Sequence, residues 1–167
     1  MIEPFRHNSW ATIRLLEFCR DLDPAQLDAC APGAYGPLKE TLAHVVGWEE
    51  LLAGAVEGTS PQDAPPRFAS VSDLLERATR LADRWERSLD PEPHPERLVE
   101  FGVRGARRLV RVGTVLAQVV HHGNHHRSQV CSAFNAVDID PPALDAWAYA
   151  AWFAESADRR RRRDDSL

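Results

Sequence analysis

Apolar residues recur every three or four positions in four long stretches of the chain, which is the pattern of a helix with one buried face. Gly58 marks the end of the second stretch, because glycine readily adopts the left-handed conformation that follows many helices. Ser70 is suited to cap the start of the third stretch, with Asp73 three residues on. The four predicted helices cover residues 4–22, 37–57, 71–90 and 114–135.

The segments between these helices carry other signals. Prolines interrupt residues 23–37, where glycines join them, and residues 59–69, so both segments are predicted to be loops. Residues 97–112 alternate apolar with polar or small side chains. This alternation predicts a short β-hairpin, with its turn near Arg104–Arg107.

The C-terminal part of the chain changes from apolar to charged. Prolines at 141 and 142 open a short fifth helix that runs to about Ala151, and beyond residue 155 almost every residue is charged. The predicted fold class is therefore all-α: a four-helix bundle with a short β-hairpin between its third and fourth helices and a short C-terminal helix. We expect one domain over residues 1–155 and a disordered, charged tail over 156–167.

The composition of the chain argues against two classes of partner, nucleic acids and membranes. The formal net charge is −5, whereas a nucleic-acid surface needs a basic patch, so we expect no nucleic-acid partner. No stretch approaches the roughly 20 apolar residues that span a bilayer, and the polar start does not resemble a signal peptide. The three cysteines are too widely spaced for a disulfide framework. We therefore expect a cytoplasmic protein with reduced thiols and no membrane partner.

Four of the seven histidines lie close together on the fourth predicted helix, between His121 and His126. Residues four apart on a helix project from the same face, so His122 and His126 form one pair and His121 and His125 form another. The first pair shares the apolar face of this helix and is therefore predicted to point into the bundle. Two imidazoles at this spacing can bind one metal ion with little rearrangement.

A third ligand is expected from another helix, because a catalytic metal site typically has three protein ligands and an open position. His44 is the best candidate, since it lies on the second predicted helix one turn before Trp48, and Glu49 is the nearest acidic alternative. Plainer explanations exist for these residues as well. A single histidine is usually a surface or core residue without a metal, and paired histidines also occur on solvated faces.

Several neighbours of these histidines are candidates for supporting roles. Arg127 is suited to pair with a carboxylate or an anionic substrate, or equally to form a salt bridge in solvent. Gln129 is suited to hydrogen-bond a ligand or to pack within the bundle. Glu49, His125 and His121 are candidate general bases, although each is also explained as a solvated residue or as a support for a ligand.

The order of these segments resembles the DinB superfamily of bacterial metal-binding four-helix bundles. The similarity covers residues from about 5 to 153. The segment APGAYGPLKETLAHVVGWEELL is similar to the family's second helix, whose histidine ligand corresponds to His44. The segment HHGNHHRSQV is similar to the family's pattern of histidine, three residues, then His-Arg-Gly-Gln, which places the other ligands at His122 and His126. Ser128 stands where that pattern often has glycine, a mild change on a helix.

The resemblance implies a divalent ion (zinc, nickel, iron or manganese in relatives) and frequent homodimers. Some relatives are thiol S-transferases that use bacillithiol or mycothiol, or a thiol-dependent maleylpyruvate isomerase. An ion on three neutral imidazoles keeps its full charge and lowers the pKa of a bound water or thiol. We therefore expect a metal-dependent thiol S-transferase or related detoxifying enzyme, with a low-molecular-weight thiol and an electrophile as substrates. The alternatives are a metal-dependent hydrolase and a non-catalytic metal-binding protein of stress responses.

Overall fold

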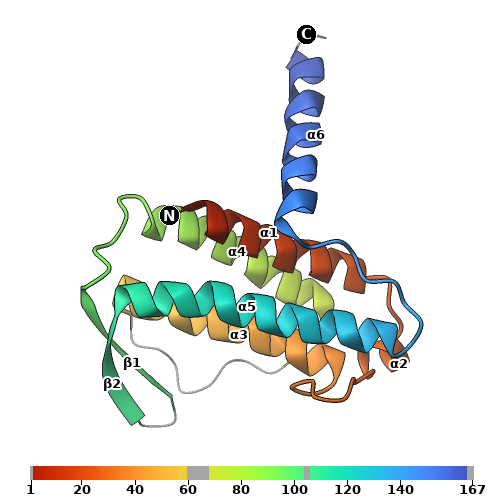
Figure 1. Cartoon of the computed structure of the whole chain (residues 1–167), viewed down its shortest axis with the longest axis horizontal. Coiled ribbons are helices and arrows are strands. Elements are labelled where there is room, and N and C mark those ends of the chain that lie inside the picture. The colour runs from red at the N-terminus through yellow and green to blue at the C-terminus, as the bar shows by residue number, and fades with distance from the viewer. Residues whose placement is uncertain (1, 60–67, 104–105, 165–167) are drawn as a thin grey trace.

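Four long helices form the body of the protein. A computed structural model describes residues 2–59, 68–103 and 106–164. The elements are, in order, α1 (Ile2–Cys19), α2 (Pro24–Leu27), α3 (Leu38–Glu57), α4 (Val71–Ser88), β1 (Leu98–Val103), β2 (Ala106–Arg111), α5 (Val112–Asn135) and α6 (Ala146–Asp164). Figure 1 shows α1, α3, α4 and α5 packed side by side, with the hairpin at one end and α6 projecting from the body. The predicted helical bundle with a hairpin between α4 and α5 is therefore confirmed.

The ends of α3 and α4 follow the predicted capping chemistry. Ser70 accepts a hydrogen bond from the backbone N–H of Asp73 at 3.0 Å, which starts α4. Gly58 ends α3 in the left-handed region, with φ at 76°, and the N–H of Thr59 then reaches the carbonyl of Gly54 at 2.9 Å. The predicted loop at 59–69 includes residues 60–67, which lie outside the described residues.

The predicted loop at 23–37 contains one helical turn, α2. The Asp23 carboxylate accepts a hydrogen bond from the N–H of Gln26 at 2.8 Å, and the Gln26 side chain accepts one from the N–H of Asp23 at 2.9 Å. Pro24 occupies the first helical position, where proline needs no hydrogen bond. The loop prediction is wrong at this point, because a reciprocal cap stabilises a turn too short to show periodicity.

The hairpin closes one end of the bundle. Strands β1 and β2 pair antiparallel, from Leu98 opposite Arg111 to Val103 opposite Ala106. Residues 104 and 105, at the predicted turn, lie outside the described residues. Val99 is buried in the main core, and Phe101 packs against that core, so the alternation seen in the sequence marks the inward face of β1.

Helix α6 begins later and extends further than predicted. Asp145 caps it by accepting hydrogen bonds from the N–H groups of Trp147 and Ala148, at 2.8 and 3.0 Å. The helix continues to Asp164, through most of the segment predicted to be disordered. Alanine, arginine and glutamate are good helix formers, and a Glu155–Arg159 pair at 3.5 Å supports the distal turns. No helix within the described residues has the length and apolar character to cross a bilayer.

A network of polar side chains crosses the apolar core. Glu49 accepts hydrogen bonds from the indole N–H of Trp85 at 2.8 Å and from the amide of Asn8 at 3.2 Å. Arg127 donates to the Asn8 side-chain oxygen at 2.8 Å and to the Thr12 hydroxyl at 3.0 Å. All five side chains are buried. Because they come from α1, α3, α4 and α5, the network joins all four bundle helices.

Burial sets the electrostatics of this network. Desolvation raises the pKa of Glu49, although hydrogen bonds from Trp85 and Asn8 and the charge of Arg127 oppose that rise. Desolvation also lowers the pKa of Arg127 to about 10. A carboxyl group with a raised pKa binds its proton more tightly in the folded chain. The stability that Glu49 contributes therefore declines as the pH rises through its folded pKa.

The Asn8 and Arg127 side chains occupy the space that a side chain at position 123 would need, so a substitution of Gly123 tests the contribution of the network to stability. A Cβ at this position would lie 2.4 Å from the Asn8 oxygen and 2.7 Å from Nη1 of Arg127. We expect Gly123→Ala to lower the free energy of unfolding by about 1–3 kcal/mol, although alanine favours helices. Urea denaturation would measure the change. Asn124→Ala, at the exposed neighbouring position, should stay within about 0.5 kcal/mol, and an unchanged or more stable Gly123→Ala protein would contradict the network's role.

Candidate metal centre

Three histidines from two helices converge between α3 and α5. His44 projects from the first half of α3, and His122 and His126 project from successive turns of α5. Each offers one ring nitrogen, and these three nitrogens lie within 4.8 Å of one another. His126 is buried, and the other two are half-buried. The expected convergence of the two helices on one point is therefore present in the fold.

The spacing of the rings suits a single small cation. The Nε2 atoms of His44 and His122 are 3.0 Å apart, and the ring centroids of all three histidines are 4.5 to 4.9 Å apart. Two imidazole nitrogens at about 2.0–2.1 Å from one tetrahedral ion are about 3.3 Å apart. The His44–His122 separation is already close to that value. The residues present therefore fit a divalent metal ion.

Burial keeps the three imidazoles in the form that a metal requires. The pKa of His44 is lowered to about 4 and that of His122 to about 3, chiefly by desolvation, and the neighbouring imidazoles add to both shifts. Desolvation also lowers the pKa of His126, although its hydrogen bond to Gln129 opposes this. All three rings are therefore neutral at pH 7, with lone pairs available to a cation.

The Gln129 side chain hydrogen-bonds both to His126 and to the loop before α3. Its side-chain oxygen lies 2.7 Å from Nδ1 of His126, so an N–H on Nδ1 donates to it and Nε2 keeps its lone pair. The same oxygen accepts a hydrogen bond from the backbone N–H of Tyr35 at 3.3 Å. The amide nitrogen donates to the carbonyl of Gly33 at 3.0 Å. A hydrogen bond between Gln129 and a candidate ligand, one of the two roles suggested for Gln129, is therefore present.

Aromatic rings flank the histidines on two sides. The ring of Tyr35, in the loop before α3, stacks on His44 with centroids 4.0 Å apart and meets His126 edge-on at 5.6 Å. The Trp48 ring lies 5.9 Å from both His44 and His122, and 6.1 Å from Phe101 of β1. Sequence reasoning missed Tyr35, because only the folded loop brings it over α3. The one sequence feature that could have indicated Tyr35 is that it is an aromatic residue in a glycine-containing loop, between Gly33 and Gly36.

Glu49 and Arg127 serve the bundle rather than the cluster of histidines. Both oxygens of Glu49 accept hydrogen bonds inside the core, so the carboxylate is not offered to an ion as an alternative ligand, nor to a substrate as a base. Arg127 is also buried, where it donates to α1. It therefore does not form the solvent salt bridge that was one interpretation of the sequence. The sequence also suggested that Arg127 pairs with a carboxylate. In the structure the charge of Glu49 attracts Arg127, and the Asn8 side chain lies between them and hydrogen-bonds to both.

His121 and His125 are exposed on α5. The ring centroid of His125 is 4.9 Å from that of His126. An exposed imidazole beside a candidate ligand can exchange protons with water. Of the candidate bases, His125 is therefore in contact with the cluster, whereas Glu49 is engaged elsewhere.

Comparison with known proteins agrees with this architecture. The DinB superfamily matches residues 8–130, a segment that contains all three histidines. The crystal structure of a DinB-like protein from Bacillus cereus ATCC 10987 is similar, with a TM-score of 0.64, 17% identity and coverage of 85% of this chain and 93% of that one. At that identity the likeness concerns the fold. Curated proteins give no match. The matched segment and the bundle with its hairpin show that this chain belongs to the DinB superfamily.

Proposed function

We propose that this protein binds a divalent metal ion through His44, His122 and His126 and catalyses thiol-dependent transfer to an electrophile. The observation that carries the proposal is the convergence of three neutral imidazoles from two helices. Imidazole nitrogens suit zinc, nickel, iron and copper. Among the described residues, no thiol or carboxylate joins the cluster, which favours an open site over a closed structural one.

The residues around the cluster have distinct tasks in such a reaction. When bound, the ion lowers the pKa of a thiol or water in an open position. Gln129 accepts the Nδ1–H of His126, which leaves the lone pair of Nε2 for an ion. The rings of Tyr35 and Trp48 provide apolar walls that limit access of water. His125 is placed to accept a proton and pass it to solvent.

A thiol suits this site better than water does. A free thiol has a pKa of about 8.5, whereas that of water is about 15.7, so a thiol needs far less help to ionise at pH 7. Hydrolysis would need a stronger base beside the ion, and Glu49 is held in the core network. The alternative of metal-dependent hydrolysis would rest on His125 as the base, because its ring lies 4.9 Å from that of His126.

Metal content tests the binding half of the proposal. We expect the purified wild-type protein to hold about one divalent ion per chain, and His122→Ala to hold little or none, because two imidazoles remain. Elemental analysis after dialysis would measure the ratio. His121→Ala is the matched control, since this exposed histidine is adjacent on the same helix and should leave the metal content unchanged. Equal metal content in both variants would exclude the proposed ligand set.

Gln129 should affect metal affinity without contacting the ion. We expect Gln129→Leu to weaken binding about 10- to 100-fold, because His126 loses the partner that fixes its ring. Competition with a chromophoric chelator would give the affinity. Gln118→Leu makes the same substitution at an exposed position of α5 and should have no effect. An unchanged affinity in Gln129→Leu would show that His126 is oriented without it.

Thiol dependence tests the catalytic half. The metal-loaded protein would be incubated with low-molecular-weight thiols, bacillithiol and mycothiol among them, and a halogenated bimane. We expect a fluorescent thioether to form as the carbon–sulfur bond replaces the carbon–halogen bond and halide leaves. The rate should fall at least 100-fold in His122→Ala and after removal of the metal. A rate equal to the uncatalysed one with every thiol tried would count against the transferase.

A further inference from the structure

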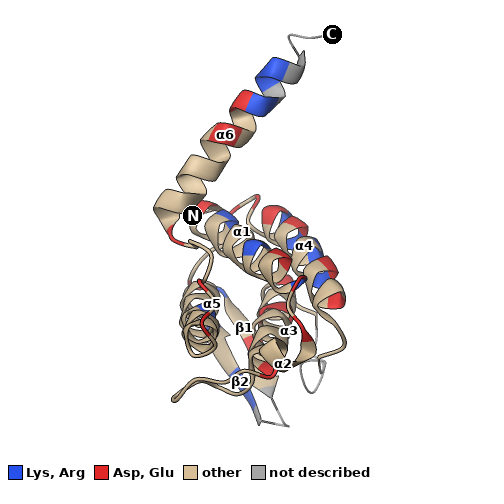
Figure 2. Cartoon of the chain, turned by 90° about the vertical axis from the view of Figure 1, so that its right-hand side faces the viewer, with Lys and Arg blue, Asp and Glu red and all other residues tan. Residues whose placement is uncertain are grey.

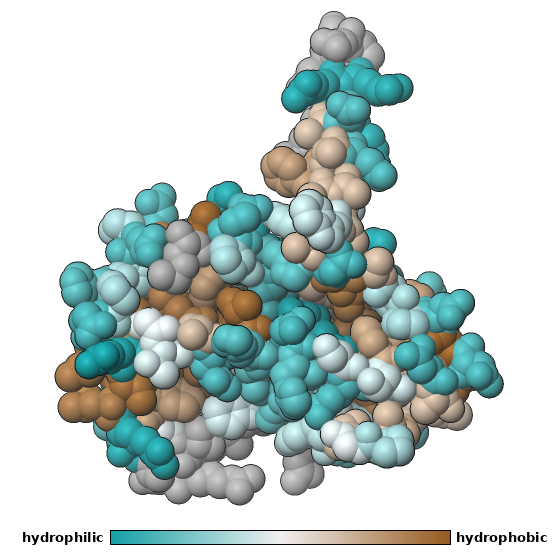
Figure 3. Space-filling view, in the orientation of Figure 1, coloured by the Kyte–Doolittle hydropathy of each residue, from teal (hydrophilic) through white to brown (hydrophobic). Residues whose placement is uncertain are grey.

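A hollow of about 400 Å³ lies where the first turns of α6 meet α1 and α4. Its apolar walls are mostly aromatic: Phe5 and Trp10 come from α1, Trp85 from α4, and Trp152 and Phe153 from α6. Figure 3 shows α6 rising clear of the body, with apolar and weakly polar colours on the half nearest the bundle. The volume falls within the range of about 300–1,000 Å³ that is typical of small-molecule sites.

This hollow is separate from the cluster of histidines. Every described residue that lines it belongs to α1, α4 or α6, whereas the histidines project from α3 and α5. Figures 1 and 2 both place α1 and α4 on the side of the bundle from which α6 rises, with α3 and α5 on the opposite side. A ligand in the hollow would therefore occupy a second site, on which the function proposed above does not depend.

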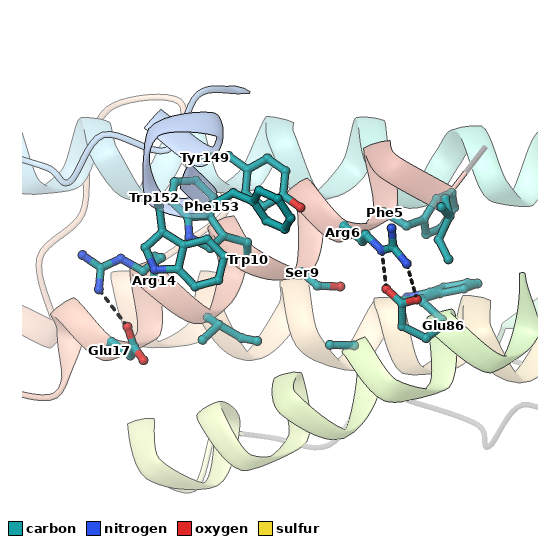
Figure 4. A pocket seen from close by; sticks show the side chains of 14 residues that line it. Phe5, Arg6, Ser9, Trp10, Arg14, Glu17, Glu86, Tyr149, Trp152 and Phe153 are labelled. Atoms are coloured by element: carbon teal, nitrogen blue, oxygen red, sulfur yellow. Dashed lines mark hydrogen bonds and ion pairs between the residues drawn. The ribbon is translucent and has the colours of Figure 1, made fainter. Parts of the chain in front are cut away.

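Two ion pairs frame the hollow, and each pair is neutral. Arg6 of α1 donates to both carboxylate oxygens of Glu86 on α4, at 2.7 and 2.9 Å. Arg14 pairs with Glu17, almost one turn further along α1, at 3.1 Å. Figure 4 shows one pair at each end of the group of lining side chains. An uncharged ligand suits this balance, because a charge taken out of water needs a partner of its own.

Ser9 and Trp10 bring unsatisfied polar groups to the hollow. Both residues are only 8% exposed. The indole N–H of Trp10 is buried without a partner, and the Ser9 hydroxyl takes part in no hydrogen bond, among the residues that the structure describes. Figure 4 shows the Ser9 hydroxyl between the two ion pairs. A buried polar group without a partner costs free energy, which a ligand that hydrogen-bonds to it recovers.

We propose that this hollow binds a small, uncharged aromatic molecule that carries a hydroxyl or carbonyl group. The ring of the ligand packs on the aromatic walls, where stacked and edge-on contacts add to the gain from burial. Its polar group hydrogen-bonds to the Ser9 hydroxyl, which can donate or accept. The ion pairs stay intact at the two ends and exclude ligands with a net charge.

The size and the fixed walls of the hollow favour a small molecule over a peptide helix. A single helical turn, about 10 Å across and 5.4 Å high, already has a volume of about 400 Å³. The wall supplied by α6 is held in place, because Tyr149 packs on Trp10 at 5.4 Å and His7 donates from Nε2 to the Leu144 carbonyl at 2.9 Å. Largely preformed walls are typical of small-molecule sites.

Calorimetric titration of the full-length protein with 2-naphthol, an uncharged bicyclic phenol, tests the proposal. We expect saturable binding with a Kd of about 100 μM or lower. The anion 2-naphthoate has the same rings and should bind at least about ten-fold more weakly, because its charge has no partner in the hollow. Ser9→Ala should weaken 2-naphthol binding about three- to ten-fold, since it removes one hydrogen bond.

Filling the hollow provides a second test. Ala82 of α4 is half-buried and lines it, so Ala82→Phe places a ring in the space that the ligand needs. We expect 2-naphthol binding to fall at least about ten-fold in this variant, with unchanged helix content by circular dichroism. Ala117→Phe is the matched control at an exposed position of α5 and should leave the Kd unchanged. His122→Ala should also bind 2-naphthol as the wild type does, so failure here is distinct from failure of the proposed metal centre.

Four results would overturn the proposal. The first is the absence of saturable 2-naphthol binding by the wild type up to the solubility limit. The second is an unchanged Kd in both Ala82→Phe and Ser9→Ala, and the third is equal affinity for 2-naphthoate. The fourth is binding that weakens as the protein concentration rises, which would assign the hollow to a second copy of this chain instead.

Discussion

The position of α3 against α5 is the constraint on which the metal centre depends, and the buried network of Glu49, Asn8 and Arg127 fixes it. Arg127 directly follows His126, and Glu49 lies just over one turn after His44. The residues that lock the two helices are therefore neighbours of those that face each other across the site. Buried charges are tolerated only where partners satisfy them, so a shift of either helix would leave a charge or donor without its partner. This requirement favours the one register in which the histidines meet.

Much of this architecture could be predicted from the sequence, because it follows from local patterns. Helical periodicity located the four bundle helices, and alternation located the hairpin. The four-residue spacing of His122 and His126 on an apolar face indicated a shared site, and an amphipathic helix indicated His44. The order of the segments along the chain indicated the family. These features require only knowledge of which face of an element is buried.

The parts that could not be predicted depend on contacts distant in sequence. Arg127 is a polar residue beside a ligand, and nothing local indicates that it turns inward to Asn8 and Thr12 of α1. Tyr35 reaches His44 only because Gln129 of α5 binds the loop that carries it. The length of α6 was missed for a different reason. A run of arginines signals solvation, and solvation is compatible with a helix as well as with disorder.

The central claim is that imidazoles from α3 and α5 bind one ion together. Anomalous X-ray diffraction from crystals of the metal-loaded protein, at the absorption edge of the bound metal, tests it most directly. The account predicts one strong peak between the two helices, about 2.0–2.1 Å from a ring nitrogen of each of the three histidines if the metal is zinc. A peak on the α5 pair with His44 turned away, or a peak elsewhere in the bundle, would contradict it.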